Sequence, residues 1–266
     1  MYSRSGAMSS QRPGTTGRVA LFVACFNDVL FPSTGRAVVE LLRRLGIGVD
    51  VPLGQTCCGQ MHINSGYPEA ARTLVRRFVE TFSAYDTVVT PSASCAGVLA
   101  LEHVRLARDA GEAALADASE AVAKRVQELS CYLVDTLGVT DVGACFPHRV
   151  TYHPTCHSLR GIRVGDRPTR LLAAVKGLEL VPLPNAEVCC GFGGTFAVKN
   201  PEVSAAMGGD KCHAITSTGA EFVTAVDNSC LAHIGGLLSR SGFAVTPMHL
   251  AEILAASEVE SPRGFR

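Results

Sequence analysis

Short apolar runs and one-sided helical stripes alternate along the first half of this chain. Residues 19–24 form an apolar run with β-branched side chains, the pattern of a buried strand. Residues 34–45 follow with Val and Leu on one helical face, and residues 47–51 predict a second strand. Pro68 suits the first turn of a second helix, and residues 87–90 predict a third strand.

The second half of the chain repeats this order, beginning with the run that precedes Cys156. Pro168 opens a helix that Gly177 ends, and Pro201 opens the next helix. Further strands are predicted at 178–182, 221–226 and 243–246. Because strands that alternate with helices pack as parallel sheets, we predict an α/β fold with mainly parallel sheets.

Between the two halves lies an Ala-rich segment, residues 112–137, whose Leu and Val side chains recur at helical spacing. This pattern predicts one long amphipathic helix that packs across or between two domains. We place the domain boundary near residues 141–147. Residues 1–17 are rich in Ser, Gly, Arg and Thr, so we expect a disordered lead-in there.

Eleven cysteines are unusual in a chain of 266 residues, and an odd number excludes complete disulfide pairing. Eight of them form two series, each with a lone Cys, a Cys-Cys-Gly triplet and a last Cys. The first series is Cys25, Cys57, Cys58 and Cys95, and the second is Cys156, Cys189, Cys190 and Cys230. The gaps are 31 and 36 residues in the first series and 32 and 39 in the second. We infer an internal duplication that gives two similar α/β domains, 18–140 and 141–266, related by a pseudo-twofold axis.

Both series have the same place in the predicted fold. The lone and last cysteines follow strands directly, and each Cys pair lies in the loop after a strand. Because the carboxyl ends of parallel strands share one edge of a sheet, the four thiols of a series should converge. Four converging thiolates are the ligand set of zinc or of an iron–sulfur cluster, and the absence of Cys-x-x-Cys leaves both open. Three cysteines outside the repeat are expected to be structural: Cys131, Cys145 and Cys212.

Charge and composition exclude several classes of protein. Lys plus Arg and Asp plus Glu are both 24, so the basic excess of a nucleic-acid-binding protein is missing. No apolar run is long enough for a transmembrane segment and no signal peptide is visible, so we expect a cytoplasmic protein. Gly191-Phe-Gly-Gly lacks the last Gly of a dinucleotide fingerprint, so neither NAD nor FAD is expected on this chain.

The cysteine pattern resembles that of the CCG cysteine-rich domain family. This family includes the cysteine-rich subunit of heterodisulfide reductase and the iron–sulfur subunits of glycolate oxidase and anaerobic glycerol-3-phosphate dehydrogenase. Within the family, several motifs resemble the lactate utilisation protein A branch. They are Phe22-Val-Ala-Cys25, Gln55-Thr-Cys-Cys-Gly-Gln60, Pro91-Ser-Ala-Ser-Cys95, His153-Pro-Thr-Cys-His157 and Cys189-Cys-Gly-Phe-Gly-Gly-Thr-Phe196. The resemblance covers residues 19–254.

This resemblance implies a part in oxidising L-lactate to pyruvate, together with two partner proteins of the same utilisation system. It also implies one or two iron–sulfur clusters of the 4Fe-4S type, held by the eight repeated cysteines. The ferredoxin motif is missing from this chain, so a partner is expected to carry ferredoxin-type clusters. The expected role is an iron–sulfur redox subunit of a complex that acts on a small 2-hydroxy acid, not a self-sufficient enzyme.

The end of each series departs from the family. The cysteine-rich subunit of heterodisulfide reductase ends both series in Cys-x-x-Cys, whereas Val98 and His233 stand at the last position here. His233 is therefore a candidate ligand, with a hydrogen-bonded structural role as the alternative. Candidates for substrate contact lie near the cysteines: Asn27, Asp28, His62, Asn64, His153 and His157, with Arg160 or Arg163 for a carboxylate.

Two other functions remain open at this point. The first is a thiol-disulfide reductase subunit of the heterodisulfide type, in which the cluster itself cleaves a disulfide. The second is a zinc-stabilised module that scaffolds partner proteins without catalysis. The metal content separates the redox functions from the scaffold, because only an iron–sulfur protein contains acid-labile sulfide.

Overall fold

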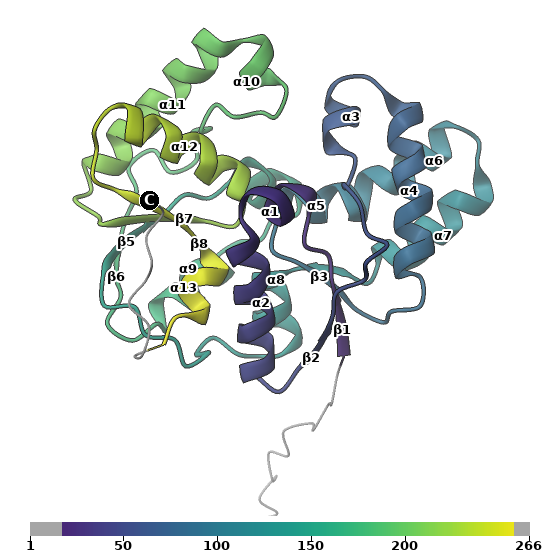
Figure 1. Cartoon of the computed structure of the whole chain (residues 1–266), viewed down its shortest axis with the longest axis horizontal. Coiled ribbons are helices and arrows are strands. Elements are labelled where there is room, and N and C mark those ends of the chain that lie inside the picture. Colours follow the sequence, from purple (N-terminus) through teal and green to yellow (C-terminus); the bar gives the residue numbers. More distant parts are fainter. Residues whose placement is uncertain (1–17, 258–266) are drawn as a thin grey trace, which may run out of the picture.

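The computed structural model describes residues 18–257, and the lead-in predicted at 1–17 lies outside this range. The described chain contains two four-stranded sheets, with strand orders β2-β1-β3-β4 and β6-β5-β7-β8 (Figure 1). Every neighbouring pair of strands is parallel. The strands are β1 (Arg18–Leu21), β2 (Gly48–Asp50), β3 (Val88–Thr90), β4 (Val126–Glu128), β5 (Arg149–Tyr152), β6 (Glu179–Val181), β7 (Phe222–Ala225) and β8 (Thr246–His249).

Helices connect these strands. In the first half they are α1 (Cys25–Leu30), α2 (Pro32–Arg44), α3 (Gln60–Asn64), α4 (Pro68–Phe82), α5 (Ala93–Gly97), the π-helical turn η1 (Val98–Glu102), α6 (His103–Asp109), α7 (Ala113–Ala123), α8 (Leu129–Cys131) and the π-helical turn η2 (Tyr132–Thr136). In the second half they are η3 (His157–Gly161), α9 (Arg167–Ala173), α10 (Phe196–Lys199), α11 (Pro201–Thr216), α12 (Asn228–Arg240) and α13 (Leu250–Ala255). None of the helices within residues 18–257 combines the length and apolar character needed to cross a bilayer.

The two halves match in detail as well as in order. The backbone N–H of Phe22, directly after β1, donates to the carbonyl of Val89 at 2.9 Å. At the equivalent place after β5, the N–H of His153 donates to the carbonyl of Thr224 at 2.8 Å. Each N–H thus continues the same strand pairing by one residue towards the cysteines. The predicted fold class, two similar α/β units with parallel sheets, is confirmed.

The prediction of one long helix over residues 112–137 is wrong. Helix α7 ends at Ala123, and residues 126–128 form strand β4, which pairs with β3 from Val88 to Thr90. The chain then turns into α8 and η2. The apolar spacing over this segment fits a helix, but β3 has backbone N–H and C=O groups along its outer edge, and residues 126–128 form hydrogen bonds with them. The last strand, β8, also begins at Thr246, where the predicted strand ends.

The two halves share one hydrophobic core. Buried residues from both halves, including Val19, Leu41, Leu133, Leu171 and Ile253, belong to one contiguous cluster. The helix that follows the last strand of each sheet packs against the other half: α13 contacts α2, and α8 contacts α9. The domain boundary near residues 141–147 lies in the segment between η2 and β5 and stays a prediction.

Polar contacts reinforce the packing of α13 on α2. The Thr34 hydroxyl donates to the Glu252 carboxylate at 2.6 Å. The Arg44 guanidinium donates to the carbonyl of Leu254 and, at 3.2 Å, to that of Ala255. These carbonyls belong to the last turn of α13, where no further helical N–H is available to them. Arg44 therefore caps the C-terminal helix of the second half from the first half.

Candidate metal centre

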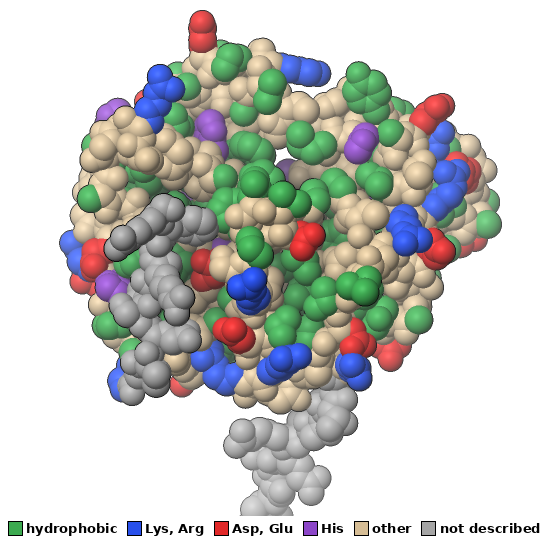
Figure 2. Space-filling model, viewed as in Figure 1, with side chains coloured by type: hydrophobic (Ala, Val, Ile, Leu, Met, Phe, Trp, Pro, Cys, Tyr) green, Lys and Arg blue, Asp and Glu red, His purple; other side chains and the backbone are tan. Residues whose placement is uncertain are grey.

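One cavity of about 260 Å³ is lined by all eight repeated cysteines. In each half the lone and last cysteines follow a central strand and the pair follows an edge strand. The carboxyl ends of both sheets point towards this cavity, so the two series meet instead of forming distant sites. Figure 2 shows hydrophobic side chains around a hollow between the lobes of the two halves. The role of the eight thiols as ligands stays a prediction.

In the first series hydrogen bonds join the thiols pairwise, Cys25 to Cys57, Cys57 to Cys58 and Cys58 to Cys95. Thiol hydrogen bonds from Cys25 and then Cys58, with a backbone N–H from Gly59, lower the pKa of Cys57 to about 2. The N–H of Gly59 lies 3.4 Å from the Cys57 Sγ atom. The same hydrogen bonds raise the pKa of Cys25 and Cys58. Cys57 is therefore the thiolate that its neighbours stabilise.

The second series repeats this arrangement. Cys156 and Cys190 donate to Cys189, whose pKa falls to about 2, and the pKa of Cys156 rises. The N–H of Gly191 lies 3.3 Å from the Cys189 Sγ atom. Backbone N–H groups aimed at sulfur are one of the levers that proteins use to stabilise thiolate-bound clusters. Each series thus presents one thiolate that the neighbouring cysteines stabilise.

The glycine after each Cys pair adopts a left-handed backbone, with φ of 91° at Gly59 and 89° at Gly191. A Cβ atom at Gly191 would lie 2.5 Å from the carbonyl oxygen of Ser204, closer than real contacts allow. At Gly59 the nearest atom would be a Leu74 methyl at 3.5 Å. Both turns need glycine for their conformation, and the second also needs it for space.

A buried carboxylate connects the two halves beside the cavity. Asp227 accepts hydrogen bonds from the Ser92 hydroxyl at 2.8 Å, the Ser94 N–H at 3.0 Å and the Thr155 hydroxyl at 2.6 Å. Asn228 donates to Asn27 at 3.1 Å and to Thr34 at 2.8 Å. Of these residues only Asn27 was among the predicted candidates. Ser92 and Asp227 were not, although both stand three positions before the last cysteines, where a helix begins.

The predicted substrate-contact residues fall into two groups. Asn27, Asn64 and His157 line the cavity, and the Nε2 atom of His157 lies 3.0 Å from the Gln60 amide nitrogen of the other half. The others do not line this cavity: Asp28, which borders an adjoining depression, and His62, His153, Arg160 and Arg163. Arg160 instead donates to the carbonyl of Glu187 at 3.1 Å. Among the described residues that line the cavity there is neither Lys nor Arg.

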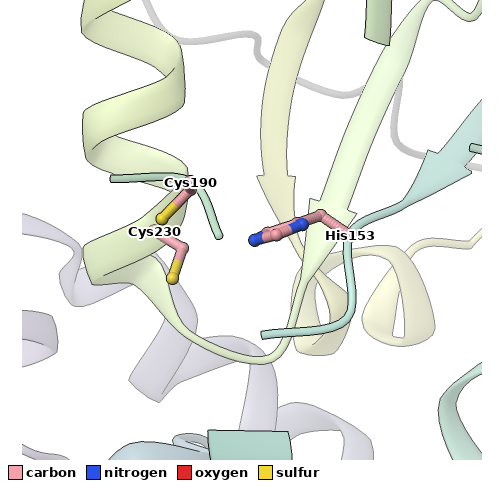
Figure 3. A group of neighbouring side chains, drawn as sticks. All are labelled: His153, Cys190 and Cys230. Atoms are coloured by element: carbon pink, nitrogen blue, oxygen red, sulfur yellow. The ribbon is translucent and has the colours of Figure 1, made fainter. Parts of the chain in front are cut away.

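Two histidines near the second series differ in their environment. The Nε2 atom of His233 lies 3.3 Å from the carbonyl oxygen of Ser204, so His233 has a hydrogen-bond partner. Within the described part of the chain, neither ring nitrogen of the buried His153 has a hydrogen-bond partner. Figure 3 shows the ring of His153 directed towards the sulfur atoms of Cys190 and Cys230, and the ligand atoms of all three lie within 4.8 Å of one another. Burial lowers the pKa of His153 to about 3, so the ring is neutral.

The three cysteines outside the repeat do not line the cavity. Cys212 is buried in α11, its thiol lies 3.7 Å from the carbonyl of Ile234, and burial raises its pKa to about 11. Burial also raises the pKa of Cys131 to about 12. These two thiols are protonated at neutral pH, as structural cysteines are.

The CCG cysteine-rich domain family matches this chain twice, at residues 19–100 and 150–235, and each match contains one cysteine series. The chain belongs to the CCG cysteine-rich domain family. It is 43% identical over 237 residues to lactate utilization protein A of Oceanobacillus iheyensis, a span of 89% of this chain and 96% of that relative. It is 45% identical over 239 residues to lactate utilization protein A of Geobacillus kaustophilus, covering 90% and 99% of the two chains.

These identities place the CCG chain in the lactate utilization protein A branch of the family, as its motifs predicted. Similarity to solved structures is much lower. An aspartate racemase homologue from Pyrococcus horikoshii OT3 matches with a TM-score of 0.31 and 10% identity, over 90% of this chain and 96% of that one.

Proposed function

We propose that this protein is an iron–sulfur redox subunit of a multi-protein system that oxidises L-lactate to pyruvate. The observation that carries the proposal is the single cavity lined by eight cysteines, four from each half. The relatives with more than 40% identity are named for lactate utilization. Oxidation of lactate to pyruvate releases two electrons and two protons, so it needs electron carriers.

The donor set fits two four-iron clusters. Cys25, Cys57, Cys58 and Cys95 would hold one, and Cys156, Cys189, Cys190 and Cys230 would hold the other. Thiolates are the ligands that such clusters use, and the N–H groups of Gly59 and Gly191 already face sulfur. When bound, each cluster accepts and releases one electron at a time. The protein's own part is to hold the two sets of thiolates side by side.

We place the lactate site on a partner protein. Lactate carries a carboxylate, which proteins bind with Arg, Lys or oriented N–H groups. The described lining of the cavity contains no Arg or Lys, and its only carboxylate is Asp227, which repels an anion. Neither Arg160 nor Arg163 lines the cavity. The cavity of this chain is therefore better suited to hold electron-carrying clusters than to bind the 2-hydroxy acid.

The first cysteine series is accessible from the surface, which would let electrons pass between it and a partner protein. Cys25 is exposed, whereas Cys58 and Cys95 are buried. Val29 and Leu53, which border the depression beside Cys25, are also exposed. A partner protein that docks there would bring its own cofactor close to the first centre. We expect two partners in the cytoplasm, at least one with ferredoxin-type clusters.

Metal analysis tests the proposal directly. Iron, acid-labile sulfide and zinc are measured on the anaerobically purified chain. We expect about four irons and four sulfides per cluster. Cys58→Ala and Cys190→Ala should each remove about half of the iron, since each disables one series, while Cys212→Ala should keep all of it. Zinc without sulfide, even after reconstitution with iron and sulfide, would contradict the proposal and favour the scaffold.

A second test addresses the physiological role. Deleting the gene should abolish growth on L-lactate as the carbon source in a strain without another lactate dehydrogenase. The gene with Cys58→Ala or Cys190→Ala should not restore growth, whereas the Cys212→Ala gene should. Normal growth of the deletion strain on lactate would show that the substrate is a different one.

A further inference from the structure

The two halves differ at two equivalent positions beside their cysteines. Phe22 and His153 each stand three residues before the lone cysteine and make the same backbone hydrogen bond to the neighbouring strand. Phe78 and Lys211 each stand ten residues after the proline that opens α4 or α11. An aromatic pair in the first half is therefore replaced by two basic side chains in the second.

In the first half these positions are purely apolar. The rings of Phe22 and Phe78 pack edge to face with centroids 5.9 Å apart, and Phe82 contacts both. A phenyl ring offers no lone pair to a metal. Nothing at this position adds to the four thiols of the first series.

The equivalent position of the second half holds a buried imidazole that has no hydrogen-bond partner among residues 18–257. His153 is 1% exposed, and both its ring nitrogens lack a hydrogen bond. Lys211 is equally buried, but its ammonium group donates to the carbonyls of Asn185 and Ala186 at 2.8 and 3.2 Å. Buried polar groups in folded proteins almost always have partners, so a buried ring with two free nitrogens indicates a ligand.

The position of the ring identifies that ligand. One nitrogen of His153 and the sulfur atoms of Cys190 and Cys230 lie within 4.8 Å of one another. Both cysteines belong to the second series, and Figure 3 shows their sulfur atoms on the side towards which the ring points. Imidazole nitrogen and thiolate sulfur are both common ligands of zinc and iron. His233, the candidate ligand from the sequence, instead has its Nε2 atom within hydrogen-bond distance of the carbonyl of Ser204.

We propose that His153 coordinates the metal centre of the second series through one ring nitrogen, so that the two centres differ in their ligands. The inference rests on the proposed function for the presence of a centre. The first centre is held by thiolates alone, and the second by thiolates together with a neutral imidazole. In the second centre the neutral ring takes the place of one anionic thiolate on its metal atom, which makes that centre easier to reduce, as histidine ligation does in Rieske centres. The ammonium group of Lys211 acts in the same direction.

Pulsed electron paramagnetic resonance tests this ligand. The anaerobically purified full chain, reduced with dithionite, should show a strong ¹⁴N hyperfine coupling from a bound imidazole. Growth with ¹⁵N-histidine should replace that coupling by the ¹⁵N pattern. His153→Phe, which installs the residue of the first half, should abolish the coupling and lower the reduction potential of one centre only. His233→Gln is the matched control and should leave both coupling and potentials unchanged.

Each other outcome has one meaning. A chain with full iron and sulfide but no histidine coupling overturns the ligand while the proposed function stands. The same holds if the coupling persists in His153→Phe. If that variant does not fold, the ¹⁵N-histidine experiment is made on the unaltered chain and on His233→Gln and His157→Gln: a histidine coupling that persists in both variants supports His153, and its loss in either one overturns the assignment. A chain that contains only zinc refutes the proposed function, and X-ray absorption at the zinc edge then distinguishes a nitrogen-containing ligand set from an all-sulfur set.

Discussion

Glu128 is a carboxyl group that is 2% exposed and lies at the end of β4, where the backbone enters α8. It accepts hydrogen bonds from the N–H groups of Ser130 at 2.9 Å and Cys131 at 3.3 Å. In the second half His249 caps α13 in the same way, accepting from the N–H of Ala251 at 3.0 Å. Desolvation outweighs these hydrogen bonds and raises the pKa of Glu128 to about 7.

Glu128 should therefore make the protein less stable as the pH rises. Its folded pKa lies above the unfolded value, so the folded state binds more protons between pH 4.5 and about 7. The free energy of unfolding should fall across this window by about 3 kcal/mol and stay level above it. Urea unfolding of Glu128→Gln should lack this loss, because the amide caps α8 without a charge.

The difference in unfolding free energy between the unaltered chain and Glu128→Gln separates the effect of this carboxyl group from that of other titrating groups. The pKa of His153 is lowered to about 3, so this residue makes the free energy of unfolding rise with pH between about pH 3 and 6.5, opposite to the effect of Glu128. Both proteins contain His153, so its contribution cancels. A difference in unfolding free energy that is the same at pH 5 and pH 8 would contradict the assignment to Glu128.

At the scale of elements, the turn between each Cys pair and the next helix sets how closely backbone approaches the thiols. Gly59 leads into α3, and Gly191 packs against α11. Both have a left-handed conformation, but only the turn at Gly191 is closed by a carbonyl group, that of Ser204. The Ser204 hydroxyl in turn donates to the carbonyl of Gly191 at 2.8 Å. The two turns therefore tolerate a side chain to different degrees.

Alanine at these two glycines should separate conformation from space. Gly59→Ala is expected to cost about 1–2 kcal/mol of unfolding free energy, because a side chain disfavours the left-handed conformation. Gly191→Ala should cost about 2–5 kcal/mol, since the backbone of α11 must also move. Urea unfolding measures both, and iron content should fall only in Gly191→Ala. Equal losses for the two variants would show that the Ser204 carbonyl does not restrict the turn.

At the scale of the whole molecule, Asp227 joins the two halves by accepting hydrogen bonds from both. Its carboxylate is 2% exposed and accepts from Ser92 and Ser94 of the first half and Thr155 of the second. The shared hydrophobic core and the exchange of α8 and α13 join the same two halves elsewhere. We therefore expect the halves to unfold together.

Asp227→Asn should destabilise the whole chain by about 2–4 kcal/mol, because an amide cannot accept from all the donors that the carboxylate satisfies. Urea unfolding should show one transition at a lower midpoint, reported alike by circular dichroism and tyrosine fluorescence. Asp141→Asn is the control: this exposed carboxylate accepts one N–H, from Gly143 at 2.9 Å, and its loss should cost less than about 1 kcal/mol. Two separate transitions in the Asp227→Asn variant would instead mean that this carboxylate holds the halves in one cooperative unit.

Outside residues 112–137, the sequence by itself determined the order of the main strands and helices, and it determined the internal duplication and the convergence of each cysteine series. These follow from local rules: apolar periodicity selects the element, and the carboxyl ends of parallel strands share an edge. The left-handed turns at Gly59 and Gly191 are signalled by the same triplet. Tertiary structure decided what depends on a partner far away in the chain. Residues 126–128 became a strand because β3 had a free edge, and only packing of the halves placed both series on one cavity, with Asp227 between them. Periodicity and spacing describe neighbours along one element, whereas the partner of a buried imidazole such as His153 depends on which side chains the completed fold brings beside it.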